Sequence, residues 1–93
     1  QIDGPIAEVM NPTPYDTKFA AFGWNVIECS AHDFDSIEAA YKAARECTDK
    51  PSVIISHSIK GKGVSFMENN VAWHGAAPND EQYEIAMHDL GER

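Results

Sequence analysis

Basic residues are scarce in this sequence of 93 residues. Seven Lys and Arg stand against fifteen Asp and Glu, which gives a net charge of −8 at pH 7. No basic run offsets this excess of acid. A nucleic-acid backbone would repel such a chain, so the composition argues against nucleic acid as a partner.

Long apolar runs are also missing. A membrane-spanning helix needs about 20 consecutive apolar residues, and no stretch approaches that length. No signal peptide is visible. The content of 43% hydrophobic and 24% charged residues is ordinary for a globular chain, and we predict a cytoplasmic protein without membrane contact.

Cysteine is rare, and the patterns that mark common catalytic sites are absent. Cys29 and Cys47 show no CxxC or metal-ligand spacing; we predict buried free thiols in a reducing compartment, with a disulfide as the alternative. The histidines show no HxxxH spacing, and no serine stands in a GxSxG setting. Neither a zinc site nor a serine nucleophile elbow is therefore predicted.

Strand and helix patterns alternate along the chain. Apolar runs predict strands at 24–30 and 52–56, and the start of the chain, before a loop that begins at Asp3, is interpreted as the tail of a third. The second of these runs is nearly continuous, which favours a parallel sheet that is buried on both faces.

Three helices are expected, and capping signals mark the last two. The first follows the Pro14 region, and the others begin where Asp35 with Glu38 and Asn79 with Gln82 form capping boxes. The order predicts an α/β fold that is half of a doubly wound parallel sheet, with three strands and about three helices. Residues 1–93 then form one domain and no second one.

The stretch "IKGKGVSFMENN" follows the second apolar strand, at a place where doubly wound folds bind ligands. Gly61 and Gly63 accept positive φ at little cost. Their N–H groups could form an anion-binding concavity, with Lys60 or Lys62 adding charge. Taken alone, the pattern is explained more simply by a plain surface turn.

His74, in "WHG", is the histidine best placed for proton transfer. Histidine titrates near neutral pH and is the commonest residue in general acid–base catalysis. A structural or solvated histidine is the simpler alternative at this position. The histidines at positions 57 and 88 are predicted to be structural. His32 lies at the carboxyl end of a strand, where a role near a ligand is the alternative to the structural role that we predict.

Taken together, these segments carry a family resemblance. The series "IDG", "AAFGWNV", "AHDFDSIEAA", "KPSVIISHSIKGKGVSFME" and "WHGAAPNDEQYEIA" resembles transketolase, over the later part of its thiamine-diphosphate-binding half. The resemblance runs from residue 1 to residue 90 and implies the thiamine-diphosphate-binding fold. It also implies an enzyme that transfers a two-carbon ketol unit between sugar phosphates.

The resemblance assigns roles to five residues. His74 matches the histidine that lies beside the cofactor diphosphate and the sugar substrate and assists proton transfer. Ile59 and Ile2 match residues near the thiazolium ring. Lys60 and Gly61 fall at the mouth of that site and are assigned to cofactor binding.

The resemblance also implies groups that this sequence lacks. The GDG motif and the asparagine that hold the divalent metal, taken to be Mg, are absent, so no metal ligand is assigned here and these ligands are expected upstream. The glutamate that activates the cofactor is expected from a partner, the pyrimidine-binding C-terminal transketolase subunit or domain, in a homo- or hetero-oligomer. This chain alone is expected to be inactive.

Two alternatives stay open. Deoxyxylulose-phosphate synthase is similar in its fold, cofactor and lysine-glycine loop, although "WHGAAP" fits transketolase better. The other alternative is a non-catalytic folding or interaction fragment, because open sheet edges invite association.

Overall fold

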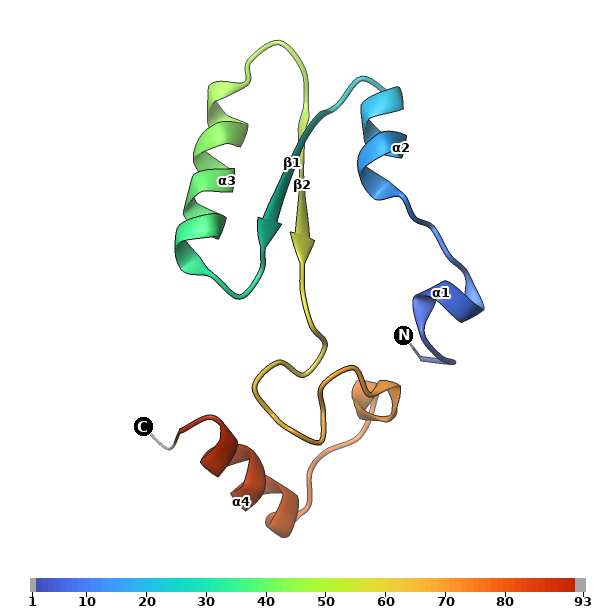
Figure 1. Cartoon of the computed structure of the whole chain (residues 1–93), viewed down its shortest axis with the longest axis vertical. Coiled ribbons are helices and arrows are strands. Elements are labelled where there is room, and N and C mark those ends of the chain that lie inside the picture. The colour runs from blue at the N-terminus through green and yellow to red at the C-terminus, as the bar shows by residue number, and fades with distance from the viewer. Residues whose placement is uncertain (1, 92–93) are drawn as a thin grey trace. The chain divides into compact units, whose positions relative to one another are not determined.

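The computed structural model describes residues 2–91 of the chain (Figure 1). These residues form two compact units. One contains residues 12–58, and the other contains the segment up to residue 11 together with the segment from residue 59 onward. We call them the sheet unit and the loop unit.

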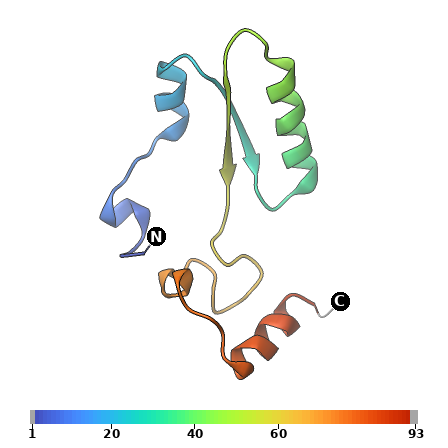
Figure 2. The same cartoon turned by 180° about the vertical axis from the view of Figure 1, so that it is seen from behind.

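The sheet unit is a helix–sheet–helix sandwich. Its two strands pair in parallel with Asn25 opposite Ser52 and Ser30 opposite His57. Both views place the two helices on opposite sides of this sheet (Figures 1 and 2). In chain order the elements are α2 (Tyr15–Ala21), β1 (Asn25–Ser30), α3 (Phe34–Glu46) and β2 (Ser52–His57).

The core of the sheet unit lies where α3 meets the sheet. Cys29 on β1 is 6% exposed and Ala40 on α3 is 4% exposed. The Cys29 sulfur lies 3.4 Å from the hydroxyl of Ser56 on the neighbouring strand. Small side chains at these positions let the helix approach the strands closely. The α/β class and the parallel sheet are thus confirmed.

The number of strands was predicted wrongly. The described residues form two strands instead of three, and the segment that precedes Ile6 contains none. A strand is defined by its hydrogen-bonded neighbour, and no described residue pairs with this segment. Instead, a short helix, α1 (Ile6–Val9), follows Pro5 and brings the α-helices of residues 2–91 to four.

The start of α3 also differs from the prediction. Asp33, not Asp35, is the N-cap, and its side chain accepts a hydrogen bond from the Asp35 N–H at 3.2 Å. The N–H of Ser30 donates to the hydroxyl of Ser36 at 3.0 Å, which closes the turn between β1 and the helix.

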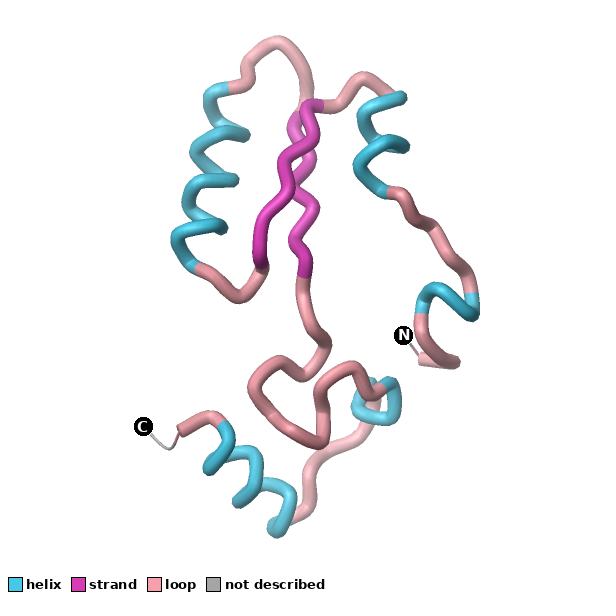
Figure 3. The backbone as a smooth tube through the Cα atoms, viewed as in Figure 1, coloured by secondary structure: helices cyan, strands magenta, loops and turns pink. Residues whose placement is uncertain are grey.

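The loop unit has little regular structure. Besides α1 it contains a 3₁₀ turn, η1 (Val71–His74), and α4 (Asp80–Asp89). The predicted capping box of α4 is confirmed, since Asn79 and Gln82 exchange two hydrogen bonds of 2.9 Å. Figure 3 shows the long irregular segment that links β2 to η1.

Both cysteines are free thiols. Cys29 is buried as predicted, whereas Cys47 is half-buried, because it lies at the C-cap of α3 and not within a core. No helix within residues 2–91 combines the length and apolar character that a membrane span requires.

Candidate functional site

All five residues that the sequence singled out lie in the loop unit. Ile59 follows the last residue of β2 by two positions, so the segment that begins there leaves the carboxyl end of the parallel sheet. Lys60 and Gly61 open the glycine loop, His74 is the last residue of η1, and Ile2 lies at the beginning of the described chain.

The two glycines of the loop adopt the predicted left-handed conformation. Gly61 has φ 71° and Gly63 has φ 93°. A Cβ at Gly61 would lie 2.5 Å from the backbone oxygen of Met67, and one at Gly63 would lie 3.1 Å from Leu90 Cδ2. Glycine is therefore required at these positions because other residues of this chain, Met67 and Leu90, lie so close to them.

Backbone hydrogen bonds fold the loop into successive tight turns. The N–H of Lys62 donates to the Ile59 carbonyl at 3.2 Å, and the N–H of Val64 donates to the Gly61 carbonyl at 3.1 Å. Asn69 closes the loop by donating to the Lys60 carbonyl at 2.9 Å. Val64, 7% exposed, is the buried centre of this segment.

Glu68 binds the interior of the loop. Its Oε1 atom accepts a hydrogen bond of 3.0 Å from the Gly63 N–H and lies 3.8 Å from Nζ of Lys62. The Gly63 donor is thus already satisfied, and the charge of Lys62 is partly offset. This leaves Lys60 better suited than Lys62 to meet an anion.

Asp89 binds the loop from α4. Its Oδ2 atom accepts hydrogen bonds from the Ser65 hydroxyl at 2.6 Å and from the Ser65 N–H at 2.8 Å. These two bonds, the hydroxyl first, lower the pKa of Asp89 below its ordinary value of 3.8. Neither Glu68 nor Asp89 was predicted, since a carboxylate on a helix or in a loop looks like solvated surface in a sequence.

His74 is presented by a turn that has its own cap. The Oδ1 atom of Asn70 accepts a hydrogen bond from the Ala72 N–H at 3.1 Å. Trp73 packs on Phe66 with ring centroids 5.1 Å apart. These contacts fix the turn, while the imidazole of His74 itself is exposed and accessible to a ligand.

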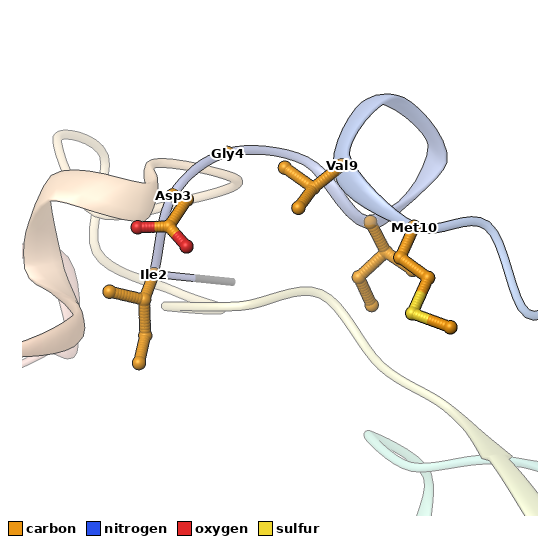
Figure 4. A pocket seen from close by; sticks show the side chains of 6 residues that line it. Ile2, Asp3, Gly4, Val9 and Met10 are labelled. Carbon is orange, nitrogen blue, oxygen red and sulfur yellow. The ribbon is translucent and has the colours of Figure 1, made fainter.

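Ile2 borders a shallow hollow of about 290 Å³. In Figure 4, Ile2 and Asp3 lie at one end of it and Val9 and Met10 at the other, with Gly4 between them. The side chain of Ile2 is 68% exposed. Such exposed apolar surface suits the face of a flat organic ring.

The chemistry of these residues fits part of a cofactor site. Apolar surface at Ile2, a cation at Lys60 and an accessible imidazole at His74 suit the ring and the anionic end of thiamine diphosphate. Among residues 2–91, no group of three or more His, Cys, Asp or Glu side chains is arranged to hold a metal ion.

Comparison with known proteins gives a consistent result. The family described as "Transketolase, thiamine diphosphate binding domain" matches residues 1–93. One of the subunits of the apulose-4-phosphate transketolase of Phocaeicola vulgatus is 39% identical over 93 residues, which is 100% of this chain and 33% of that protein.

Two further relatives extend the comparison. The 6-deoxy-6-sulfo-D-fructose transketolase subunit SqwG of a Clostridium species is 38% identical over 97% of this chain and 33% of its own length. Transketolase-1, chloroplastic, of Arabidopsis thaliana is 35% identical over 97% of this chain and 12% of its own length. The chain thus spans about a third of the length of the first relatives that it matches. It belongs to the transketolase family and lies within the thiamine-diphosphate-binding domain.

Proposed function

We propose that this chain forms one wall of the active site of a transketolase that moves a two-carbon ketol unit from a ketose phosphate to an aldose phosphate. The observation that carries the proposal is the position of the candidate residues. These residues come from three separate places in the sequence, at Ile2, at Ile59–Gly61 and at His74, yet all belong to the loop unit.

His74 is the proposed catalytic residue. Its imidazole is exposed at the end of η1, and a neutral imidazole can accept or donate a proton at the substrate oxygens. Thiamine diphosphate, when bound, supplies the electron sink for breaking the carbon–carbon bond. Histidine then needs only to move protons to and from the sugar.

The remaining four residues are proposed to hold the cofactor. Ile2 and Ile59 offer apolar surface to its thiazolium ring. Lys60 offers an ammonium group to a phosphate, and Gly61 turns the chain so that the backbone after Ile59 passes close to the ligand.

The other components of the site are proposed to lie outside this chain. Mg would be held by ligands upstream of residue 1, and a pyrimidine-binding transketolase subunit or domain would complete the site in an oligomer. Three relatives are named as single subunits of transketolases, which supports a partner chain. On this proposal residues 1–93 are the later part of a cofactor-binding domain, and two free thiols suit a cytoplasmic location.

The test is turnover by the assembled enzyme, in which this chain is present with its upstream segment and its partner. We expect thiamine-diphosphate-dependent ketol transfer, and His74→Asn is expected to lower kcat by about 100-fold or more while the cofactor Kd stays within a factor of two.

His88→Asn is the matched control, because His88 lies on α4 of the same unit and its side chain is 88% exposed. Turnover that survives His74→Asn would contradict the catalytic role. A well-folded assembly that never transfers a ketol unit would favour the non-catalytic fragment.

A further inference from the structure

The tripeptide Glu68–Asn69–Asn70 contacts both functional parts of the loop unit. Glu68 binds the Gly63 N–H at 3.0 Å, and Asn69 binds the Lys60 carbonyl at 2.9 Å. Asn70 caps the turn that ends in His74. Three consecutive residues thus join the glycine loop to the histidine.

Glu68 makes the two lysines of the loop unequal. Its carboxylate lies 3.8 Å from the Lys62 ammonium, so an incoming anion would compete with it for Lys62. The ion pairs formed among residues 2–91 do not include Lys60, whose side chain is half-buried. An anion therefore meets less competition at Lys60 than at Lys62.

Asn69 and Asn70 fix the backbone between the glycine loop and η1. Asn69 has φ 52°, a conformation that asparagine tolerates better than most residues, and this bend carries the chain from the loop into η1. Asn70 bonds in two directions, since its Oδ1 accepts from the Ala72 N–H at 3.1 Å and its Nδ2 donates to the Phe66 carbonyl at 3.3 Å.

We propose that Glu68–Asn70 is a positioning element that makes Lys60 the anion-binding lysine of the loop and fixes the turn that ends in His74. Glu68 and Asn70 act through other residues and need not touch the ligand. The inference rests on the proposed function, because the anion is taken to be a phosphate group of the cofactor or of the sugar substrate.

The first test compares the lysines in the assembled holoenzyme. Lys60→Met is expected to weaken binding of the phosphate-bearing ligand about tenfold and to reduce the salt dependence of binding. Lys62→Met is expected to change it less than twofold. Lys42→Met, in the sheet unit, controls for the loss of one positive charge.

Two ligands are titrated, so that the source of the phosphate is identified. A change in the Kd of thiamine diphosphate, followed by tryptophan fluorescence, assigns Lys60 to the diphosphate. A change in the KM of the ketose phosphate, with the cofactor Kd constant, assigns it to the sugar. Equal effects of the two lysines on either ligand would overturn the proposal.

The second test removes the negative charge that competes with an incoming anion for Lys62. Glu68→Gln keeps an oxygen that can accept from the Gly63 N–H but removes the charge that faces Lys62. In this background Lys62→Met is expected to weaken binding at least fivefold, although it is nearly silent in the wild type. Absence of this coupling would contradict the role given to Glu68.

The third test concerns His74. Asn70→Ala is expected to lower kcat about tenfold while the cofactor Kd stays constant, and Asn70→Asp, which still accepts from the Ala72 N–H, is expected to restore most of it. If Asn70→Ala lowered kcat and also raised the cofactor Kd, and Asn70→Asp restored neither, the role of Asn70 would be merely structural. Wild-type enzyme that binds neither ligand would instead refute the proposed function itself.

Discussion

Different interactions stabilise the sheet unit and the loop unit, each within itself. Between β1 and β2 the backbone forms a continuous parallel ladder, and Cys29 and Ala40 are buried against α3. In the loop unit only Val64 is buried among the described residues. There, side-chain carboxylates and amides bind the backbone, as Glu68 does at Gly63.

This difference separates stability from function. A backbone ladder tolerates many side chains, because its hydrogen bonds do not depend on residue type. The loop unit depends on particular polar side chains, each of which can be removed by one substitution. We therefore expect substitutions in the sheet unit to act mainly on unfolding, and substitutions in the loop unit to act on ligand binding and turnover as well.

The largest expected effect comes from a pair of glycines, one in each unit. Gly61 and Gly23 both have positive φ, at 71° and 85°. A Cβ at Gly61 would lie 2.5 Å from the Met67 oxygen, whereas one at Gly23 would have no described atom within 4 Å. Gly61→Ala is expected to destabilise the loop unit by about 3 kcal/mol, and Gly23→Ala to cost about 1 kcal/mol.

Hydrogen exchange in the assembled enzyme measures both effects. Residues 59–70 should lose protection in Gly61→Ala, while those of β1 and β2 stay protected. If the two alanine variants were equally destabilised, the close approach of the Met67 backbone to Gly61 would be refuted.

Next in size is the loss of the buried side chain of the loop unit. Val64→Ala removes two methyl groups from a side chain that is 7% exposed and is expected to cost about 2 kcal/mol. Ala40→Gly, its counterpart on α3, is expected to cost about 1 kcal/mol or more through helix propensity. Each change should raise hydrogen exchange in its own unit; a loss of protection spread evenly over both would mean that the units unfold together.

A smaller and pH-dependent effect belongs to Asp89. Its pKa is lowered by the hydrogen bonds from Ser65, so their contribution to stability is complete above the ordinary value of 3.8 and is lost as the pH falls through the lowered pKa. Ser65→Ala removes the hydroxyl but keeps the N–H donor. We expect the pKa of Asp89 to rise while it stays below 3.8, as measured by carboxyl ¹³C NMR titration.

The control for this titration is Ser58→Ala, which removes an exposed serine hydroxyl that has no partner among residues 2–91. An Asp89 pKa that is the same in the wild type and in Ser65→Ala would show that the 2.6 Å hydroxyl contact does not form.

The smallest effect is expected in the sheet unit. Glu28 and His57 lie 3.4 Å apart on neighbouring strands, but their side chains are 51% and 64% exposed. Because water screens such a pair, Glu28→Gln should change the free energy of unfolding by less than about 1 kcal/mol. A larger change in thermal melting at neutral pH would mean that polar pairs hold the sheet unit too, which would weaken the contrast between the two units.

Features that depend on neighbouring residues alone were predicted well from the sequence. The capping box of Asn79 and Gln82 forms as expected, because both partners lie within one helical turn. Positive φ at Gly61 and Gly63 is likewise a local property of glycine. Even so, the α3 cap was misplaced by two residues, since Asp33 and Asp35 lie two positions apart and both can cap a helix.

Apart from the parallel pairing of the two strands, features that depend on distant partners were not predicted. The expected third strand does not form among residues 2–91, because a strand needs a neighbour with which to share hydrogen bonds. The role of Asp89 was missed for the same reason, and that of Glu68 was missed because its bond to Gly63, five residues away, is formed within an irregular loop. Asp89 lies 24 residues from Ser65, and no spacing rule connects them.

By itself the sequence determined the α/β class, the parallel strand runs, the free cysteines and the family resemblance, because composition, periodicity and short motifs encode these locally. Only the tertiary structure decided which lysine of the glycine loop is offset by a carboxylate, and that the loop, η1 and residues 2–11 belong to one unit. Those facts depend on distances between atoms that folding brings together, and linear order does not specify such distances.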